Sequence, residues 1–247
     1  MSHKKASKSM IRDMEVVILC GGKGTRMGEA ARYIPKPLIK IGQKPILWHI
    51  LNYYSSWGIN NFILCLGYKG HKIRQYFSNN KKWNITFVDT GLGTNTGGRI
   101  KKVKKYIKRE TFFATYGDGV SDINLVKLLK YHKEKGKIAT VTAVRPMSQF
   151  GVMVLNNDAS IKKFEEKPRL DHWVNGGFFV FEKGIFSYLS GENDILEKGP
   201  FEKLAKNNDI VAYKHAGFWK CMDTYKDNLE LNNMYESGKA VWANWRR

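Results

Sequence analysis

A glycine-rich segment that contains an arginine directly follows a short apolar run near the start of the sequence. The segment is Gly21-Gly22-Lys23-Gly24-Thr25-Arg26, and Lys36 follows it between two prolines. Glycines let backbone N–H groups approach phosphate oxygens and tolerate the positive φ that such a loop needs. Arginine and lysine supply the positive charge that phosphates attract. The pattern predicts a site for a nucleoside triphosphate, whose phosphates Arg26 and Lys36 would hold.

Two common phosphate-binding motifs do not fit this spacing. The dinucleotide fingerprint G-x-G-x-x-G, counted from Gly22 and Gly24, would need a third glycine where the sequence has Met27. A P-loop would need a glycine followed by Lys-Ser or Lys-Thr, and no glycine here has that continuation in the required frame. An ordinary strand-to-helix turn is the alternative for a bare glycine pair. The arginine and the Pro-Lys-Pro sequence favour phosphate binding.

Two aspartates lie at the boundaries of predicted elements. Asp118 lies between two glycines just after the apolar run 111–116, which would place its carboxylate at the end of a strand. Asp223 lies much later in the chain, just before a stretch of helical period. An aspartate at a turn can instead serve the turn itself, and Asp223 could cap the final helix.

The order of further motifs resembles that of the sugar-1-phosphate nucleotidylyltransferases, and among them most closely those that transfer a cytidylyl group to glucose 1-phosphate. Besides G-G-x-G-T-R and P-K-P, the shared blocks lie at 41–49, 89–91, 96–99, 116–120, 166–168, 175–179, 217–219 and 222–224. They keep the family's order from about Glu15 to Trp242, so the resemblance covers nearly the whole chain. Several blocks are weak indicators singly, but the ordered set is highly specific.

The resemblance implies transfer of CMP from CTP to a sugar 1-phosphate, with α-D-glucose 1-phosphate as the expected acceptor and pyrophosphate as the second product. A sugar phosphate has a second pKa of about 6, so its oxygen is ionised at neutral pH and needs no general base. Such a transfer depends on alignment and on charge neutralisation by Mg²⁺ and cationic side chains. By resemblance, Asp118 and Asp223 bind the Mg²⁺, Arg26 holds the leaving phosphates and Lys36 lies near the α-phosphate.

The resemblance also implies which residues bind each substrate. On the nucleotide side we expect, besides Arg26 and Lys36, the residues Leu19, Gly21, Gly22, Lys23, Gly24, Thr25, Thr94, Thr96, Arg99 and Gly117. On the sugar-phosphate side we expect Gly151, Glu166, Lys167, Asn175 and Gly176. There Lys167 would contact the sugar phosphate and Glu166 would accept hydrogen bonds from sugar hydroxyls. A solvated strand edge is the alternative for this Glu-Lys pair.

The elements that would position these residues alternate along the first half of the chain. Apolar runs predict strands at 16–19, 62–66, 85–88 and 111–116, and helical periods predict helices that begin near 45, 73, 100 and 122. Alternation of this kind predicts a parallel sheet with helices on its faces. Ligands of such sheets bind beyond the carboxyl ends of the strands, where 21–26 and 117–118 both fall.

The second half of the chain has a different pattern. Strand-like runs at 139–144, 151–155, 161–164 and 174–181 predict a more antiparallel layer, and a last helix is expected at 225–237. We therefore expect an α/β fold of the nucleotide-diphospho-sugar transferase type, with a mixed, mainly parallel central sheet. Its parts would be a flexible basic tail (1–14) and a single domain (15–247), made of a Rossmann-like nucleotide-binding half (15–137), a sugar-binding half (138–223) and a C-terminal helix and tail (224–247).

Composition narrows the class of protein. No apolar run approaches the length of about 20 residues that a membrane span needs, and the basic start lacks the apolar stretch of a signal peptide. The sequence has three cysteines and no C-x-x-C pair, which argues against a disulfide framework and against a zinc site made of thiolates. Its six histidines do not have the spacing of a metal-binding motif. We expect reduced thiols, a cytoplasmic location and no membrane partner. The family resemblance implies a homo-oligomer.

The net charge of +20 leaves open the possibility of a nucleic-acid-binding protein. Lysines dominate the excess and are scattered over expected helix faces, whereas nucleic-acid surfaces usually combine arginine with exposed aromatic residues in one patch. A general bias toward lysine is the simpler explanation, and no nucleic-acid partner is expected. Other hypotheses are a related enzyme with another nucleotide or acceptor, a nucleotide-binding module without catalytic turnover, and a nucleic-acid-binding protein.

Overall fold

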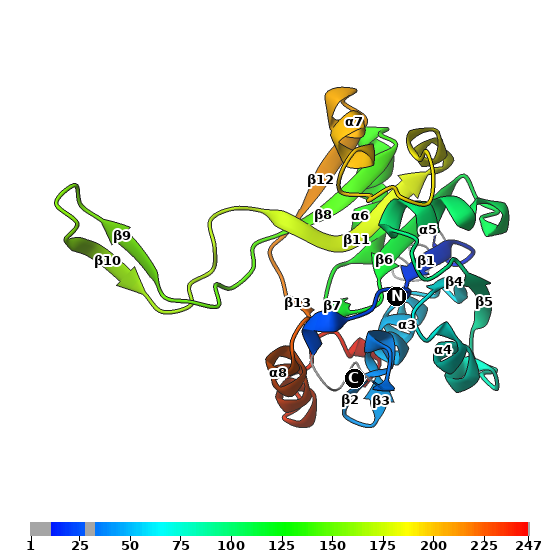
Figure 1. The fold of residues 1–247 in the computed structure, drawn as a ribbon, viewed down its shortest axis with the longest axis horizontal. Helices are drawn as coiled ribbons and strands as arrows, with labels where there is room; N and C mark the ends of the chain where they lie inside the picture. Colours follow the sequence, from blue (N-terminus) through cyan, green and yellow to red (C-terminus); the bar gives the residue numbers. More distant parts are fainter. Residues whose placement is uncertain (1–10, 28–32, 247) are drawn as a thin grey trace, which may run out of the picture.

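A seven-stranded sheet in the order β12-β8-β11-β6-β1-β4-β5 forms the centre of the structure (Figure 1). The computed structural model describes residues 11–27 and 33–246. The strands of this sheet are β1 (Glu15–Leu19), β4 (Asn61–Leu66), β5 (Asn84–Asp89), β6 (Thr111–Tyr116), β8 (Ala139–Val144), β11 (Val174–Glu182) and β12 (Ile210–His215). The mixed, mainly parallel sheet predicted from the sequence is confirmed.

The strand β1, which lies inside the sheet between β6 and β4, is buried on both faces. Val16 and Ile18 pack into one apolar cluster and Val17 and Leu19 into another, because successive side chains of a strand point to opposite faces. β1 pairs in parallel with both β4 and β6. A continuous apolar run is typical of a parallel strand that is covered on both sides.

Helices cover the two faces of the sheet. One cluster includes residues of α3 (Ile46–Ser56), α4 (Gly70–Phe77), α6 (Leu125–Lys135) and α8 (Tyr225–Glu236), and the other includes residues of α5 (Thr96–Lys102) and α7 (Pro200–Lys206). The helix expected at 100–107 in fact begins at Thr96 and ends at Lys102, and a 3₁₀ turn follows it. The glycine pair in its first turn, which disfavours a helix, concealed this start in the sequence.

The strand β11 is antiparallel to both of its neighbours, β6 and β8. The edge strand β12 pairs in parallel with β8 and was not predicted, because its side chains are only half-buried and lack a clear apolar run. Gly177, with φ of +73°, lies where the register between β11 and β8 shifts. The second half of the chain therefore adds one antiparallel strand within an otherwise parallel sheet.

Two predicted strands do not join the sheet. β9 (Val152–Leu155) and β10 (Ile161–Glu165) pair with each other in an antiparallel hairpin that projects from the body (Figure 1). Every residue of both strands is exposed. The prediction that they form a layer with β8 and β11 is wrong, because strand propensity does not specify the pairing partner.

Two pairs of two-residue or three-residue strands complete the described structure. β2 (Lys40–Ile41) pairs with β3 (Lys44–Pro45), and β7 (Gly119–Ser121) pairs in antiparallel fashion with β13 (Trp219–Cys221). The pairing of β7 with β13 is important for function, because it joins the segments that carry the two candidate metal-binding aspartates. Strands this short leave no periodic signal in the sequence.

Both ends of the described chain contact the apolar core. Ile11 is fully buried and Met14 is 7% exposed, so the predicted boundary of the tail at residue 14 moves back to Ile11. Residues 1–10 of that tail lie outside the described part. Near the other end, Trp242 is fully buried and its ring lies 5.4 Å from that of Phe218.

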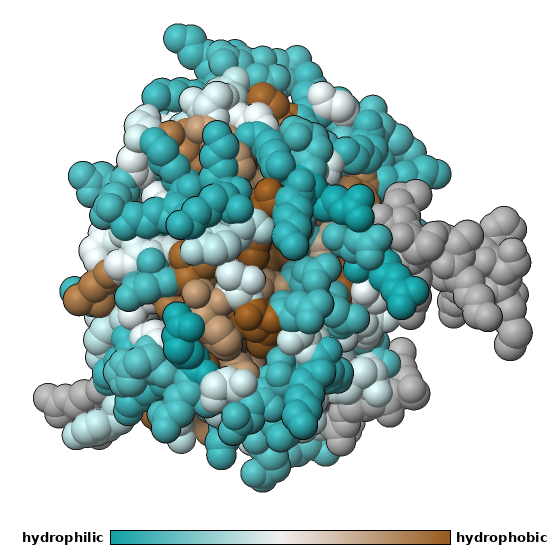
Figure 2. All heavy atoms as spheres, turned by 90° about the vertical axis from the view of Figure 1, so that its right-hand side faces the viewer, coloured by the Kyte–Doolittle hydropathy of each residue, from teal (hydrophilic) through white to brown (hydrophobic). Residues whose placement is uncertain are grey.

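The face of the molecule drawn in Figure 2 is polar over most of its area, with a smaller apolar region at its centre. Cys20 and Cys65 are buried free thiols, as expected, and Cys221 is a half-buried one. Among the residues that the structure describes, no helix has both the length and the apolar character that crossing a membrane requires.

Candidate active site

Two loops meet at the carboxyl ends of β1 and β6. Leu19 is paired with Tyr116 in the parallel register of these strands, so the glycine-rich segment and Gly117-Asp118 leave the sheet side by side. Between them lies a cavity of about 230 Å³. It is lined by Leu19, Cys20, Gly22, Gly24, Thr25, Arg26, Lys36, Pro37, Tyr116, Gly117, Asp118 and Asp223.

Lys36 lies at the centre of the polar contacts in this cavity. It begins a 3₁₀ turn between two prolines, and only 10% of its side chain is exposed. Its Nζ donates to Oδ2 of Asp118 at 2.6 Å and to Oδ1 of Asp223 at 2.6 Å. Burial disfavours the ammonium form, but the two carboxylates outweigh it and raise the pKa of Lys36. Lys36 is therefore positively charged at neutral pH.

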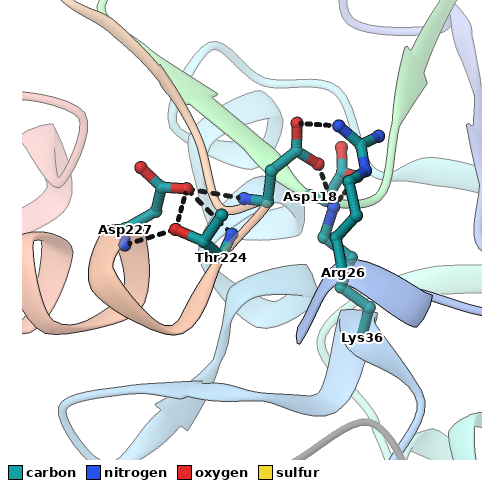
Figure 3. A network of polar contacts seen from close by, with 6 residues as sticks. Arg26, Lys36, Asp118, Thr224 and Asp227 are labelled. Carbon is teal, nitrogen blue, oxygen red and sulfur yellow. Dashed lines mark hydrogen bonds and ion pairs between the residues drawn. The ribbon is translucent and has the colours of Figure 1, made fainter. Parts of the chain in front are cut away.

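Arg26 reaches one carboxylate of this pair, that of Asp223, from the glycine-rich segment (Figure 3). Its Nη1 lies 3.2 Å from Oδ2 of Asp223, while 75% of its side chain is exposed. The cavity thus holds two cations against two carboxylates. An exposed guanidinium can turn toward another anion at small cost, since surface ion pairs contribute only about 0–1 kcal/mol.

The backbone brings the two aspartates together. β7 begins directly after Asp118 and pairs with β13, which ends two residues before Asp223. The N–H of Met222 donates to the carbonyl of Asp118 at 2.8 Å. Asp118, Cys221 and Asp223 each present one possible ligand atom, and these atoms lie within 4.8 Å of one another. Carboxylate oxygens are suitable ligands for hard cations such as Mg²⁺, whereas burial raises the pKa of the Cys221 thiol and keeps it protonated.

Asp223 is not the cap of the final helix. The N-cap of α8 is Thr224, whose Oγ1 accepts the N–H of Asp227 at 3.2 Å. The carboxylate of Asp223 points instead toward Lys36 and Arg26. The capping interpretation of this residue is excluded by the geometry.

Arg99, predicted to bind the nucleotide, lies beneath the glycine-rich segment and does not line the cavity. It is 5% exposed, and its guanidinium donates to the carbonyls of Leu66, Gly91 and Gly21 and to Oγ1 of Thr90. Burial lowers its pKa. A Cβ at Gly21 would lie 2.0 Å from Nη1 of Arg99, so a side chain at this position would displace the guanidinium from these hydrogen bonds.

The two predicted threonines also have structural partners. Oγ1 of Thr94 donates to the carbonyl of Thr90 at 2.6 Å, and Oγ1 of Thr96 donates to Glu197 at 3.0 Å. Lys23 is exposed at the surface of its loop and is not among the residues that line the cavity. The structure thus brings Arg26, Lys36, Asp118 and Asp223 together and leaves Lys23, Thr94, Thr96 and Arg99 around them.

The predicted sugar-phosphate residues are divided between the sheet and the hairpin. Asn175 donates to the hydroxyl of Tyr116 at 3.3 Å, and the Gly176 carbonyl accepts the indole N–H of Trp219 at 2.6 Å. Glu166 and Lys167 lie at the hairpin and form an exposed ion pair at 3.0 Å. Gly151 lies near Glu166, since a Cβ on it would be 3.0 Å from Oε2 of that residue.

A second groove adjoins the cavity. It has a volume of about 560 Å³ and lies between the base of the hairpin and the start of α8. Lys167, Arg169 and Lys220 line it, and Asp223 lines both this groove and the cavity. The groove therefore connects the hairpin residues with the carboxylate pair.

Sequence reasoning did not assign a role to Tyr116 or Glu197. Tyr116 lines the cavity and donates its hydroxyl to Glu197, and burial together with this carboxylate raises its pKa. The position of Tyr116 immediately before Gly117-Asp118 was the only sequence feature that could have indicated its place at the cavity. Glu197 lies 81 residues from Tyr116 in the sequence, and no sequence feature connected the two.

Comparison with known proteins gives a consistent result. A family model described as nucleotidyl transferase matches residues 15–238. A probable glucose-1-phosphate cytidylyltransferase of Bacillus subtilis is 46% identical over 255 residues, covering 94% of this chain and 100% of the relative. The glucose-1-phosphate cytidylyltransferase of Salmonella typhimurium is 40% identical over 257 residues, with the same coverage of 94% and 100%.

The fold also matches solved structures. The crystal structure of HddC from Yersinia pseudotuberculosis complexed with GMP-PN has a TM-score of 0.72 at 24% identity, covering 90% of this chain and 99% of that one. The crystal structure of an apo UDP-glucose pyrophosphorylase has a TM-score of 0.72 at 18% identity, and the match covers 92% of this chain and 99% of that one. At these identities the likeness shows the fold alone.

Proposed function

We propose that this chain, which belongs to the nucleotidyl transferase family, transfers CMP from CTP to α-D-glucose 1-phosphate and releases pyrophosphate and CDP-glucose. Nucleotidyl transfer is the activity of its family, and the two relatives named as glucose-1-phosphate cytidylyltransferases match it over nearly its full length. The observation that carries the proposal is the buried Lys36 ammonium at the end of a glycine-rich loop, 2.6 Å from each of two carboxylates.

The reaction is an in-line displacement at the α-phosphorus of CTP. An oxygen of the sugar phosphate forms the new bond, while the bond from the α-phosphorus to the oxygen that bridges to the β-phosphorus breaks. Pyrophosphate leaves with that electron pair. The attacking phosphate has a second pKa of about 6, so it is ionised at neutral pH and no side chain has to remove a proton.

The cavity residues would align and neutralise the triphosphate. Backbone N–H groups at Gly22 and Gly24 can approach its oxygens, since neither residue carries a Cβ. Arg26, largely exposed, would turn from Asp223 to the β- and γ-phosphates and hold them with its planar fork. Lys36 would remain beside the α-phosphate because its burial restricts its movement. Arg99 would contribute indirectly, by holding the Gly21 carbonyl.

We propose Mg²⁺ as the cofactor, bound by Asp118 and Asp223. The fit rests on the donor set, which offers two carboxylates in one cavity, and on the cationic Lys36 Nζ that already lies 2.6 Å from each of them. When bound, the ion would supply charge neutralisation at the phosphate oxygens.

The groove beside the cavity is our proposed site for the sugar 1-phosphate. Lys167 and Arg169 line it and offer positive charge to the phosphate, whereas Lys220 is paired there with Asp227 and Glu230. Asp223 connects the groove with the nucleotide cavity. Glu166, paired with Lys167 at 3.0 Å, would accept hydrogen bonds from sugar hydroxyls. Gly151, Asn175 and Gly176 would complete this side.

The test is pyrophosphate release measured with each of four nucleoside triphosphates and a panel of sugar phosphates, with Mg²⁺ and with a chelator. We expect the highest kcat/KM for CTP with glucose 1-phosphate and no turnover with the chelator. A different preferred pair would make the chain another nucleotidyltransferase of the same fold. No turnover with any pair, together with tight CTP binding in calorimetry, would indicate a binding module.

We also propose that the chain forms a homo-oligomer. The projecting hairpin exposes large apolar side chains, with Phe150 76%, Leu155 55% and Phe164 58% exposed, and such side chains are typical of contact surfaces. Sedimentation of the wild type and of a Phe150→Ser, Phe164→Ser double variant tests this, since the variant should dissociate. A monomeric wild type would refute it.

The cytoplasm is the compartment we propose, because all three cysteines are free thiols. We expect no nucleic-acid partner despite the charge of +20. Steeply salt-dependent binding to DNA at physiological ionic strength would contradict this expectation.

A further inference from the structure

The carboxylate of Asp227 lies beside Thr224 (Figure 3) and accepts a hydrogen bond from the backbone N–H of Asp223. Its Oδ2 accepts the N–H of Asp223 at 3.2 Å, the N–H of Thr224 at 2.8 Å and the hydroxyl of Thr224 at 2.7 Å. One oxygen atom thus fixes two consecutive peptide groups, and the first of them belongs to a proposed ligand of the metal ion.

The other oxygen of Asp227 connects this turn to β13. Oδ1 lies 3.2 Å from Nζ of Lys220, a β13 residue that is paired with Val120 of β7. β7 follows Asp118 directly. The Asp227 side chain therefore links the start of α8, the backbone of Asp223 and the strand pair that holds Asp118 nearby. Only 14% of this side chain is exposed.

Capping alone does not require all of these bonds. A capping box needs one bond from the side chain at the third helical position to the N–H of the cap residue, which here is the bond to Thr224. The helix α7 has such a box, in which Glu202 accepts the N–H of Gly199 at 3.3 Å. There the N–H of the preceding residue, Lys198, donates to the carbonyl of Ile195 instead. The bond from Asp227 to Asp223 thus extends the box by one residue, to the residue that faces Lys36.

We propose that Asp227 is a positioning residue, which holds the backbone of Asp223 so that its carboxylate and that of Asp118 can bind one divalent cation. This inference rests on the proposed function, because it concerns the same carboxylate pair. Side chains that orient metal ligands without contacting the metal typically change metal affinity by about 10–100-fold when they are removed. For a backbone contact we expect the lower end of this range.

Binding of Mn²⁺, followed by the electron paramagnetic resonance of the free ion, tests the proposal without depending on turnover. In Asp227→Ala the Mn²⁺ affinity should fall about tenfold. Asp227→Asn keeps an acceptor oxygen for the two N–H groups and should stay within about threefold of the wild type. Glu202→Ala removes the matching carboxylate from α7 and should leave the Mn²⁺ affinity unchanged. In steady-state assays at limiting Mg²⁺, Asp227→Ala should lower kcat.

The outcomes separate this inference from the proposed function. Wild-type Mn²⁺ affinity in a folded Asp227→Ala would overturn the positioning role, and so would an equal loss in Glu202→Ala, because helix stability alone would then explain it. If Asp227→Ala does not fold, Thr224→Val removes the hydroxyl that holds Oδ2, and an unchanged affinity in that variant would be decisive against the proposal. A wild-type chain that binds no Mn²⁺ would refute the metal site itself.

Discussion

The nucleotide cavity and the projecting hairpin both carry residues predicted from the sequence, but only in the cavity do predicted charged residues from distant segments pair with one another. Lys36, Asp118 and Asp223 come from three distant segments and lie within hydrogen-bonding distance. Glu166 and Lys167 are neighbours in the sequence, pair with each other and have side chains that are 61% and 50% exposed. The difference follows from the backbone, because a parallel sheet aligns the ends of its strands whereas a two-stranded hairpin has nothing to align with.

This comparison predicts that the cavity determines catalysis and nucleotide binding, and that the hairpin determines acceptor binding alone. The following variants test it, beginning with the largest expected effect.

Asp118→Asn should have the largest effect. Loss of one carboxylate from the pair removes a proposed metal ligand and leaves the Lys36 ammonium short of a partner, so kcat should fall about a thousandfold. Stopped assays of pyrophosphate release measure this, with circular dichroism to establish folding. Asp209→Asn, which alters a carboxylate that accepts the Tyr188 hydroxyl, is the matched control. Retention of more than a tenth of the activity by Asp118→Asn would contradict the role of the cavity.

Lys36→Met should reduce turnover about a hundredfold, because an aligned charge near the α-phosphate is lost. The same variant should bind Mn²⁺ more tightly than the wild type when no nucleotide is present, since the ammonium no longer neutralises Asp118 and Asp223. Calorimetry with MnCl₂ measures the second effect. Lys40→Met, an exposed lysine of β2, is the control. Weaker Mn²⁺ binding by Lys36→Met would show that the lysine supports the metal site.

Lys167→Ala should raise the KM for glucose 1-phosphate about tenfold, which is the size expected for one charge-assisted contact at an accessible site. The affinity for CTP should change less than twofold. Lys163→Ala removes a lysine from the same hairpin that pairs with Glu165 and should change neither quantity. If Lys167→Ala weakened the binding of CTP and of glucose 1-phosphate equally, the cavity and the hairpin would not have separate roles.

Asp227→Ala should have the smallest effect, a loss of stability to unfolding whose size depends on pH. Burial raises the pKa of Asp227, but hydrogen bonds from Thr224 and the charge of Lys220 outweigh it and leave the pKa below the ordinary 3.8. Since the folded state binds the proton less readily than the unfolded state, the carboxylate stabilises the fold above pH 3.8 and ceases to do so as the pH falls through the folded-state pKa.

Urea unfolding measures this contribution. At pH 7 the loss of the cap should lower the free energy of unfolding by about 1 kcal/mol, and the difference from the wild type should shrink as the pH falls below 3.8. Asp158→Ala removes the carboxylate that accepts the Ser160 N–H in the hairpin turn and should leave the unfolding midpoint unchanged. A difference for Asp227→Ala that persists at pH 2 would assign the effect to packing.

Much of the fold was predictable because it depends on short, strongly apolar segments. β1, β4 and β6 are buried throughout or nearly so, and most of their residues are apolar. β12 was missed because its alternate side chains are exposed, and β7 and β13 because three residues show no period. The strands of the hairpin were predicted, but not their separation from the sheet.

The candidate site was predictable where chain order and loop chemistry determined position. Lys36 between two prolines and Asp118 between two glycines were evident, and the structure brings both to Asp223. The surroundings of Arg99 could not be predicted, because it donates to the backbone carbonyls of Leu66, Gly91 and Gly21, and no sequence motif identifies such partners. Asp227 has a familiar capping pattern with Thr224, but its additional bond to Asp223 appears only in three dimensions.

The pairing of β7 with β13 has a consequence for protein engineering. The separation of positions 118 and 223 is set by main-chain hydrogen bonds, among them the 2.8 Å bond from Met222 to the carbonyl of residue 118, and these do not depend on which side chains the two positions carry. Histidine or cysteine introduced at both positions would therefore inherit the same spacing, so this backbone is a ready framework for coordinating softer transition metals such as zinc.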